Sequence, residues 1–127
     1  KKMQKLKQIR NQIEKIEEAY EYMLAYAAQG RAEEGAGPDG AQIRTFLNQF
    51  SDARTQLEDT TSVIVEENPA AADFIEAFMS ESKVMGSILK VLLARKNISS
   101  EVIDNTNGLI SVRAYLTSLF FLDKSVL

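Results

Sequence analysis

Residues 68–97 read NPAAADFIEAFMSESKVMGSILKVLLARKN, and this stretch decides the fold. Asn68 and Pro69 are typical of a helix start, because Asn can cap a first turn and Pro fits the first helical position. Apolar side chains then recur at helical spacing, namely Ala71, Phe74, Ile75, Phe78, Met85, Ile88, Leu89 and Leu92, with Ala77, Val84 and Val91 widening the stripe on one flank. A helix that is apolar over more than half its girth needs neighbours on at least two sides. We therefore expect it to be the central helix of a bundle, ending at Asn97 in the left-handed conformation.

Three further helices are expected around this one. Residues 2–29 carry a heptad seam of Leu6, Ile9, Ile13, Ile16, Tyr20, Met23 and Ala27. Residues 41–67 carry a second seam of Ile43, Phe46, Leu47, Phe50, Ala53, Leu57, Thr61 and Ile64. The last helix begins after a capping serine, Ser99 or Ser100, and its core face consists of Leu109, Ile110, Val112, Leu116, Leu119, Phe120 and Leu122.

Together these segments predict an all-α fold, an antiparallel up-down four-helix bundle in a single domain over residues 1–127. We expect the last helix to be kinked or broken at Asn107-Gly108, because glycine costs a helix interior about 1 kcal/mol. Residues 123–127 are expected to fray. The chain begins without an initiator methionine, which favours a piece of a longer protein.

One long loop interrupts the helices. Residues 30–40 read GRAEEGAGPDG, where Gly30 suits the left-handed residue that closes a helix and Pro38-Asp39-Gly40 is typical of a turn. Because glycines and charged residues bury little surface, we expect this loop to contribute little to stability.

The chain contains no cysteine and no histidine. These absences exclude disulfides, thiolate chemistry, histidine-ligated zinc, haem or di-iron centres and Ser-His-Asp catalysis. Ser80-x-x-Lys83 matches a serine nucleophile motif, but its companion motifs are absent and the pattern is common by chance. We therefore expect no enzyme, no metal and no cofactor.

One stretch of the first helix shows a family resemblance. Arg10-x-x-Ile13-x-x-Ile16-Glu17 resembles the opening of the helical chorismate mutases, which would imply a bundle that binds a dicarboxylate through arginines. The family's second first-helix arginine would fall at Ala27, and Arg31 lies in the loop instead. The chain therefore lacks the main substrate clamp of that family.

The first fifteen residues are strongly basic, whereas the whole chain carries a net charge of −3. In an up-down bundle this start lies beside Glu58, Asp59, Glu66 and Glu67, so we expect charge pairing within the chain and no nucleic-acid partner. No apolar run approaches the ~20 residues that span a bilayer, and we expect no membrane span. We expect a cytoplasmic location; a periplasmic or extracellular sensor fragment is the alternative left open.

Two function classes remain. The first is a non-enzymatic interaction module, an adaptor, scaffold or regulatory subunit that acts through helix–helix contacts with a protein partner or with itself. Tyr22 lies off the heptad seam, and we predict that it docks a partner together with Met23 and Tyr26. The second class is a ligand-sensing bundle that binds a small molecule or anion between helices. Its predicted ligand-binding residues point into a gap in the core: Arg44, Arg54 and Arg113, with Tyr20 and Tyr26 as further candidates.

Overall fold

The computed structural model describes residues 2–35 and 42–127, and these ranges contain helices and no strand. The elements are α1 (Lys2–Ala28), α2 (Gln42–Asp59), α3 (Thr61–Glu67), the 3-10 turn η1 (Pro69–Ala71), α4 (Ala72–Leu93), α5 (Ser100–Asn107), α6 (Ile110–Phe121) and the π-helical turn η2 (Leu122–Val126). The prediction of an all-α fold is confirmed. Four helices were expected, whereas the described ranges contain six α-helices. The difference arises because the second and the last expected helix are each divided in two.

The second expected helix divides at Thr60. Its hydroxyl donates to the carbonyl of Leu57 at 2.8 Å, and the hydroxyl of Thr61 donates to the carbonyl of Glu58 at 2.9 Å. Such side chains compete with the backbone for the carbonyls of the preceding turn. The chain therefore leaves α2 at Asp59 and starts α3 at Thr61.

The last expected helix is broken where the sequence predicted. The amide of Gly108 donates to the carbonyls of Asp104 and Asn105, which closes α5. Leu109 then adopts an extended conformation, with φ −66° and ψ 134°, before α6 begins at Ile110. The break therefore lies in the extended backbone of Leu109, since Gly108 itself keeps a negative φ of −83°.

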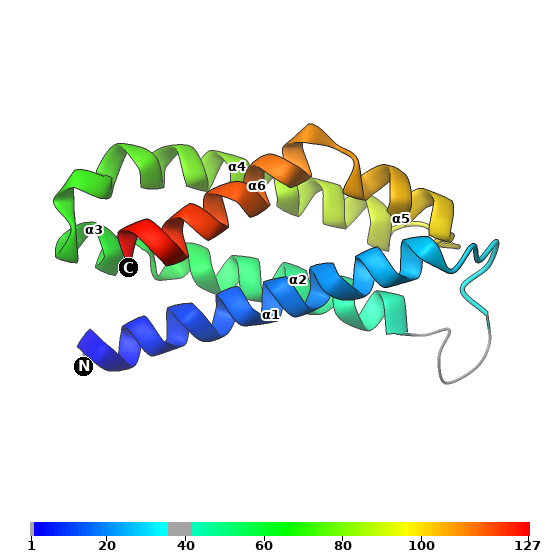
Figure 1. Ribbon diagram of the computed structural model, residues 1–127, viewed down its shortest axis with the longest axis horizontal. Helices are drawn as coiled ribbons and strands as arrows, with labels where there is room; N and C mark the ends of the chain where they lie inside the picture. Colours follow the sequence, from blue (N-terminus) through cyan, green and yellow to red (C-terminus); the bar gives the residue numbers. More distant parts are fainter. Residues whose placement is uncertain (1, 36–41) are drawn as a thin grey trace.

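The helices form two layers (Figure 1). α1 packs most extensively on α2 and also on α5, whereas α4 packs on α6 and on α2. Both chain ends lie at the same end of the molecule, and the α5–α6 break lies over the opposite half of α1 (Figure 1).

The core contains most of the predicted seams. The seam of α1 is buried at Ile9, Ile13, Ile16 and Met23, and α2 buries Ile43, Leu47, Phe50, Ala53 and Leu57. Three side chains predicted to widen the stripe of the central helix, Ala77, Val84 and Val91, are instead exposed. Three side chains assigned to the last core face are also exposed, namely Leu109 at 45%, Ile110 at 84% and Phe120 at 47%. The bundle therefore covers less apolar surface than the sequence pattern offers.

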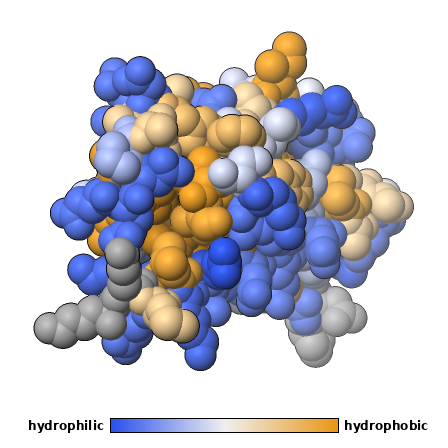
Figure 2. Space-filling view, turned by 60° about the vertical axis from the view of Figure 1, so that its left-hand side comes forward, coloured by the Kyte–Doolittle hydropathy of each residue, from blue (hydrophilic) through white to orange (hydrophobic). Residues whose placement is uncertain are grey.

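The end of the bundle that carries both termini is partly apolar. Figure 2 brings this end forward and shows a group of hydrophobic residues bordered by hydrophilic ones. Met3, in the first turn of α1, is 83% exposed, and Phe121, at the end of α6, is 50% exposed. Residues 123–127 were expected to fray. Instead, η2 continues α6, and Val126 and Leu127 pack on the core.

Two of the four predicted helix-end signals act as expected. Ser99 caps α5, its hydroxyl accepting from the amide of Val102 at 3.2 Å, and Gly30 has a positive φ of 65°. Asn68 makes no side-chain cap and precedes the 3-10 turn instead. Asn97 is not left-handed, because α4 already ends at Leu93 and Asn97 Nδ2 donates to the carbonyl of Ala32.

The segment after α1 is held against the bundle, contrary to the expectation for the loop. The amide of Ser100 donates to the carbonyl of Arg31 at 2.9 Å, and the amide of Arg31 donates to the Ser100 hydroxyl at 2.8 Å. The amide of Glu34 donates to Asn97 Oδ1 at 3.1 Å. Residues 31–35 therefore join the end of α1 to the α4–α5 connection; the rest of the predicted loop, residues 36–40, lies outside the described residues.

Lys5, Lys7, Arg10 and Lys15 are the basic residues at the start of α1 whose side chains the structure describes. Arg10 lies 4.0 Å from Asp123 of η2, and Lys5 and Lys7 form no ion pair in this part of the chain. Glu58, one of the expected partners, binds Arg54 instead at 2.6 Å. A cation at the start of a helix opposes the helix dipole.

Two buried tyrosines provide a matched test of this core. The hydroxyl of Tyr26 donates to the carbonyl of Ile98 at 2.6 Å, whereas the hydroxyl of Tyr115 has no hydrogen-bond partner among the described residues. We expect Tyr26→Phe to lower the free energy of unfolding by about 1–2 kcal/mol and Tyr115→Phe to leave it unchanged or raise it. Urea unfolding of both variants measures the difference. Equal losses would contradict the assignment and indicate a partner for Tyr115.

Candidate functional site

The first predicted ligand-binding arginine, Arg44, is already engaged within the chain. Its Nε and Nη2 donate to the two carboxylate oxygens of Glu34 at 2.9 and 2.8 Å. Its guanidinium also donates to the carbonyls of Leu93 and Arg95, at the end of α4. The hydrogen bond from Arg44 holds the pKa of the Glu34 carboxyl below its ordinary value. Arg44 therefore fastens the segment after α1 to the end of α4.

The second predicted arginine, Arg54, lies between α2 and α4, and its side chain is only 13% exposed. Its Nη1 donates to Glu58 at 2.6 Å and to both the carbonyl and the hydroxyl of Ser82 at 3.1 Å. Gly86 of α4 makes room for this guanidinium, because a Cβ there would lie 2.6 Å from Nη2. The guanidinium of Arg54 therefore fills the space between α2 and α4, and no open gap remains there for a ligand.

The predicted partner residues lie mostly inside the protein. Met23 and Tyr26 are fully buried, so neither can contact a partner in this conformation. Tyr22 is half-buried and stacks on Phe46, with ring centroids 4.3 Å apart. The structure thus argues against a partner surface formed by all three residues, and only Tyr22 keeps an outward edge.

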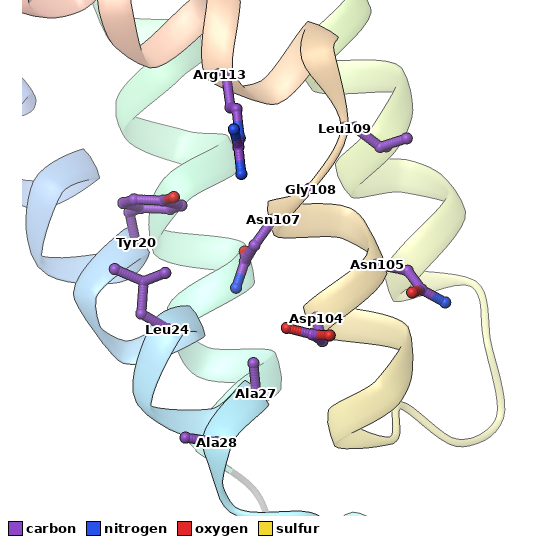
Figure 3. Close-up of a pocket in the computed structure, with 10 residues that line it drawn as sticks. All are labelled: Tyr20, Leu24, Ala27, Ala28, Asp104, Asn105, Asn107, Gly108, Leu109 and Arg113. Atoms are coloured by element: carbon purple, nitrogen blue, oxygen red, sulfur yellow. The ribbon is translucent and has the colours of Figure 1, made fainter.

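The third predicted arginine, Arg113, lines a groove between α1 and the α5–α6 break. The groove has a volume of about 580 Å³, within the range of small-molecule sites. Figure 3 shows Arg113, Tyr20 and Asn107 pointing toward one another across it. The lining residues are Tyr20, Leu24, Ala27 and Ala28 of α1, Asp104, Asn105 and Asn107 of α5, Gly108 and Leu109 of the break, and Arg113 of α6. Two predicted ligand-binding residues, Arg113 and Tyr20, thus come together at this open groove.

Asn107 brings a buried polar group to this groove. The residue is 7% exposed, and its Nδ2 donates to the carbonyl of Met23 at 3.3 Å. Its Oδ1 is buried and has no hydrogen-bond partner among the described residues. Leaving a buried acceptor unpaired costs about 1–3 kcal/mol, which is unusual in a folded protein. The wall of the groove therefore carries an unpaired acceptor beneath its surface, out of reach of solvent.

Two charges of opposite sign border the groove, and each lies at the unfavourable end of its helix. Arg113 is in the first turn of α6, which has no acidic residue, and Asp104 is in the last turn of α5, which has no basic residue. A cation at a helix start and an anion at a helix end both oppose the helix dipole. Neither side chain forms an ion pair within residues 2–35 and 42–127. Both charges are exposed and uncompensated beside a groove of ligand size.

The sequence indicated this groove only in part. Arg113 and Tyr20 were candidates for a gap between helices, and a kink or break was predicted at Asn107-Gly108, but no groove was predicted beside it. Asp104 and the burial of Asn107 carried no signal, because both depend on how closely α5 packs on α1.

Other kinds of site receive no support from the described residues. The hydroxyl of Ser80 donates to the carbonyl of Glu76, on an exposed part of α4. In the part of the chain that the structure describes, no three acidic side chains gather as a metal site would require. No helix in those same ranges has the length and apolar character needed to cross a bilayer.

Comparison of the chain with models of protein families, with curated proteins and with solved structures finds no match. The resemblance to the opening of the helical chorismate mutases is therefore not supported by any family match. The function proposed below is therefore based on the geometry of the chain itself.

Proposed function

We propose that this chain is a non-enzymatic interaction module that acts through helix–helix contacts, with a second copy of itself as the partner. The proposal includes an antiparallel up-down bundle of four helical arms: α1, α2 with α3, α4, and α5 with α6. The packing of α1 on α2 and α5, and of α4 on α2 and α6, supports that arrangement. The absence of histidine and cysteine supports a role other than catalysis.

One observation carries this proposal: the side of α4 that the bundle leaves uncovered. We call this side the outer face of α4, and its residues are Ala77, Ser80, Val84, Ser87, Val91 and Ala94. All are exposed, Val84 to 47% and Val91 to 67%. They follow one another in alternating steps of three and four residues, the spacing of a coiled-coil seam. The alanines and serines of this face have short side chains, which allow a second helix to approach closely.

The charges beside the outer face favour an antiparallel second copy. The start of α4 carries the exposed acids Asp73 and Glu76, and the end carries the exposed cations Lys90, Arg95 and Lys96. In an antiparallel pair, the acidic end of each α4 lies near the basic end of the other, and the two helix dipoles point in opposite directions. A parallel copy would place like charges together.

The outer face also fits itself in this orientation. When Val84 lies opposite Ser87 of the second copy, Ser80 lies opposite Val91 and Ala77 lies opposite Ala94. Each layer then pairs a larger side chain with a smaller one, or two alanines, as in a two-fold symmetric interface. Because one helix buries less than the ~800 Å² per partner of stable complexes, we expect a dissociation constant on the order of micromolar.

Engineered cysteines test this proposal cleanly, since the chain has none of its own. The double variant Ser80→Cys, Val91→Cys should form disulfide-linked dimers under mild oxidation, because the two positions face each other across the antiparallel contact. Ser80→Cys alone should form no disulfide-linked dimer, since the two cysteines would lie 11 residues, or about 16 Å, apart along the helix. Efficient cross-linking of the single variant would instead indicate a parallel contact.

Sedimentation of the cysteine-free chain measures the association itself. We expect a monomer–dimer equilibrium that Val84→Glu abolishes and that Ile110→Glu, a control at an exposed apolar residue of α6, leaves intact. A chain that stays monomeric at several hundred micromolar would rule out self-association.

A second candidate function is the binding of a small molecule between helices. The groove beside the α5–α6 break favours it, because the predicted residues Arg113 and Tyr20 both line it. The two functions use different surfaces, α4 for the copy and α1 with α5 and α6 for the ligand.

A further inference from the structure

The groove beside the α5–α6 break presents three distinct chemical requirements to a ligand. The guanidinium of Arg113 and the phenol of Tyr20 line the groove, and both can donate to an anion. The carboxylate of Asp104 also lines it and can only accept hydrogen bonds. The α1 side of the groove adds an apolar wall.

From this arrangement we propose that the groove binds a small zwitterion, a free α-amino acid with an apolar side chain. This inference rests on the second proposed function, ligand binding between helices. The carboxylate of the ligand pairs with Arg113 and Tyr20, its ammonium group pairs with Asp104, and its side chain packs on the apolar wall.

The apolar wall consists of Leu24, Ala27 and Ala28. Leu24 is 47% exposed, although the preceding residue on α1, Met23, is fully buried. A branched aliphatic side chain of the ligand would cover part of this exposed leucine. The two alanines beside it leave room for such a side chain, because a larger residue at either position would fill the groove.

The two charges show why one ligand must carry both signs. Arg113 and Asp104 each destabilise their own helix slightly and neither is neutralised within the described chain. A simple anion would neutralise Arg113 and leave Asp104 without a counter-charge. A simple amine would leave Arg113 unsatisfied, so only a ligand with both groups satisfies the whole groove.

Three probes that share one carbon skeleton test the proposal. They are L-leucine, 4-methylpentanoate, which lacks the amino group, and 3-methylbutylamine, which lacks the carboxylate. Isothermal titration calorimetry of the full chain should show the tightest binding for leucine, with each single-charge analogue weaker by about tenfold or more. Amide chemical shifts in NMR spectra should change around Ala27 and Asn107.

Two neutral variants assign the two ends of the ligand. Arg113→Gln should weaken leucine and 4-methylpentanoate by about tenfold and leave the amine unchanged, whereas Asp104→Asn should weaken leucine and the amine and leave 4-methylpentanoate unchanged. Lys83→Gln, an exposed cation on α4, is the matched control and should change nothing. Both groove variants should melt at or above the temperature of the parent chain, because each removes a charge from an unfavourable helix end.

The outcomes separate the two levels of the inference. If 4-methylpentanoate binds as tightly as leucine, ligand binding holds and the zwitterion class is overturned. If the affinity for leucine does not depend on Arg113 and Asp104, the groove is not the binding site. If none of the three probes binds at 10 mM, both the zwitterion and the proposed ligand-binding function fail.

Discussion

Replacing Phe78 with alanine should lower the free energy of unfolding by about 3–5 kcal/mol, the usual cost of truncating a buried aromatic side chain. Phe78 is 1% exposed and lies on the side of α4 that faces the core. Its ring stacks on Tyr115, with centroids 5.3 Å apart and an interplanar angle of 16°, and on Phe74 at 6.1 Å. Truncation would remove both ring contacts and leave a cavity between α4 and α6. Urea unfolding followed by circular dichroism measures the loss.

Phe120 provides the matched control for this prediction. It carries the same side chain on α6 but is 47% exposed. Phe120→Ala should cost about 1 kcal/mol or less, because it loses only part of the burial energy of a phenylalanine. Similar losses for both variants would mean that the packing of α4 on α6 is misassigned.

Replacing Glu34 with alanine should lower the free energy of unfolding by about 2–3 kcal/mol at neutral pH. The Glu34 carboxylate accepts two hydrogen bonds from Arg44 and a third, at 2.8 Å, from the amide of Ile98. Ile98 is fully buried, so its amide would lose its acceptor without gaining water. The variant also leaves the partly buried Arg44 guanidinium without a counter-charge.

The effect of Glu34 should depend on pH. The hydrogen bond from Arg44 lowers the pKa of the Glu34 carboxyl below its ordinary value of 4.5; the amide of Ile98 also lowers it, and burial opposes both. A carboxyl whose pKa is lower in the folded state stabilises the fold fully above its unfolded pKa, and the contribution is lost as pH falls through the folded pKa. The difference between the parent and Glu34→Ala should therefore be constant above about pH 5.5 and shrink below about pH 4.5.

The neighbouring Glu33 is the control for Glu34. It is exposed and makes no hydrogen bond or ion pair within the described ranges. Glu33→Ala should change the free energy of unfolding by less than about 0.5 kcal/mol at any pH between 4 and 8. If the two alanine variants behave alike, the segment after α1 does not hold the bundle together.

The functional residues were harder to predict than the helices. Arg44, Arg54 and Arg113 were equivalent in sequence, since each is an arginine near an apolar stripe. Only the structure shows that Arg44 donates to Glu34 and that Arg54 donates to Glu58 and Ser82. Arg113, in contrast, borders an open groove. The stacking of Tyr22 on Phe46 of α2 was likewise not evident from the sequence. Such pairings join residues far apart in the chain, and no local pattern records them.

By itself, the sequence determined that this chain is helical, where its seams lie and that the last helix breaks after Asn107. These properties follow from the spacing of apolar side chains and from glycine and capping residues, which act within a few turns of one helix. The tertiary structure decided which apolar flank stays uncovered, leaving Val84 and Val91 exposed while Met85 is buried. It also decided that the α5–α6 break opens a groove toward α1 and that residues 31–35 bind the α4–α5 connection. These features depend on the relative placement of distant helices, which comes from packing complementarity between whole faces and not from the pattern of any one helix.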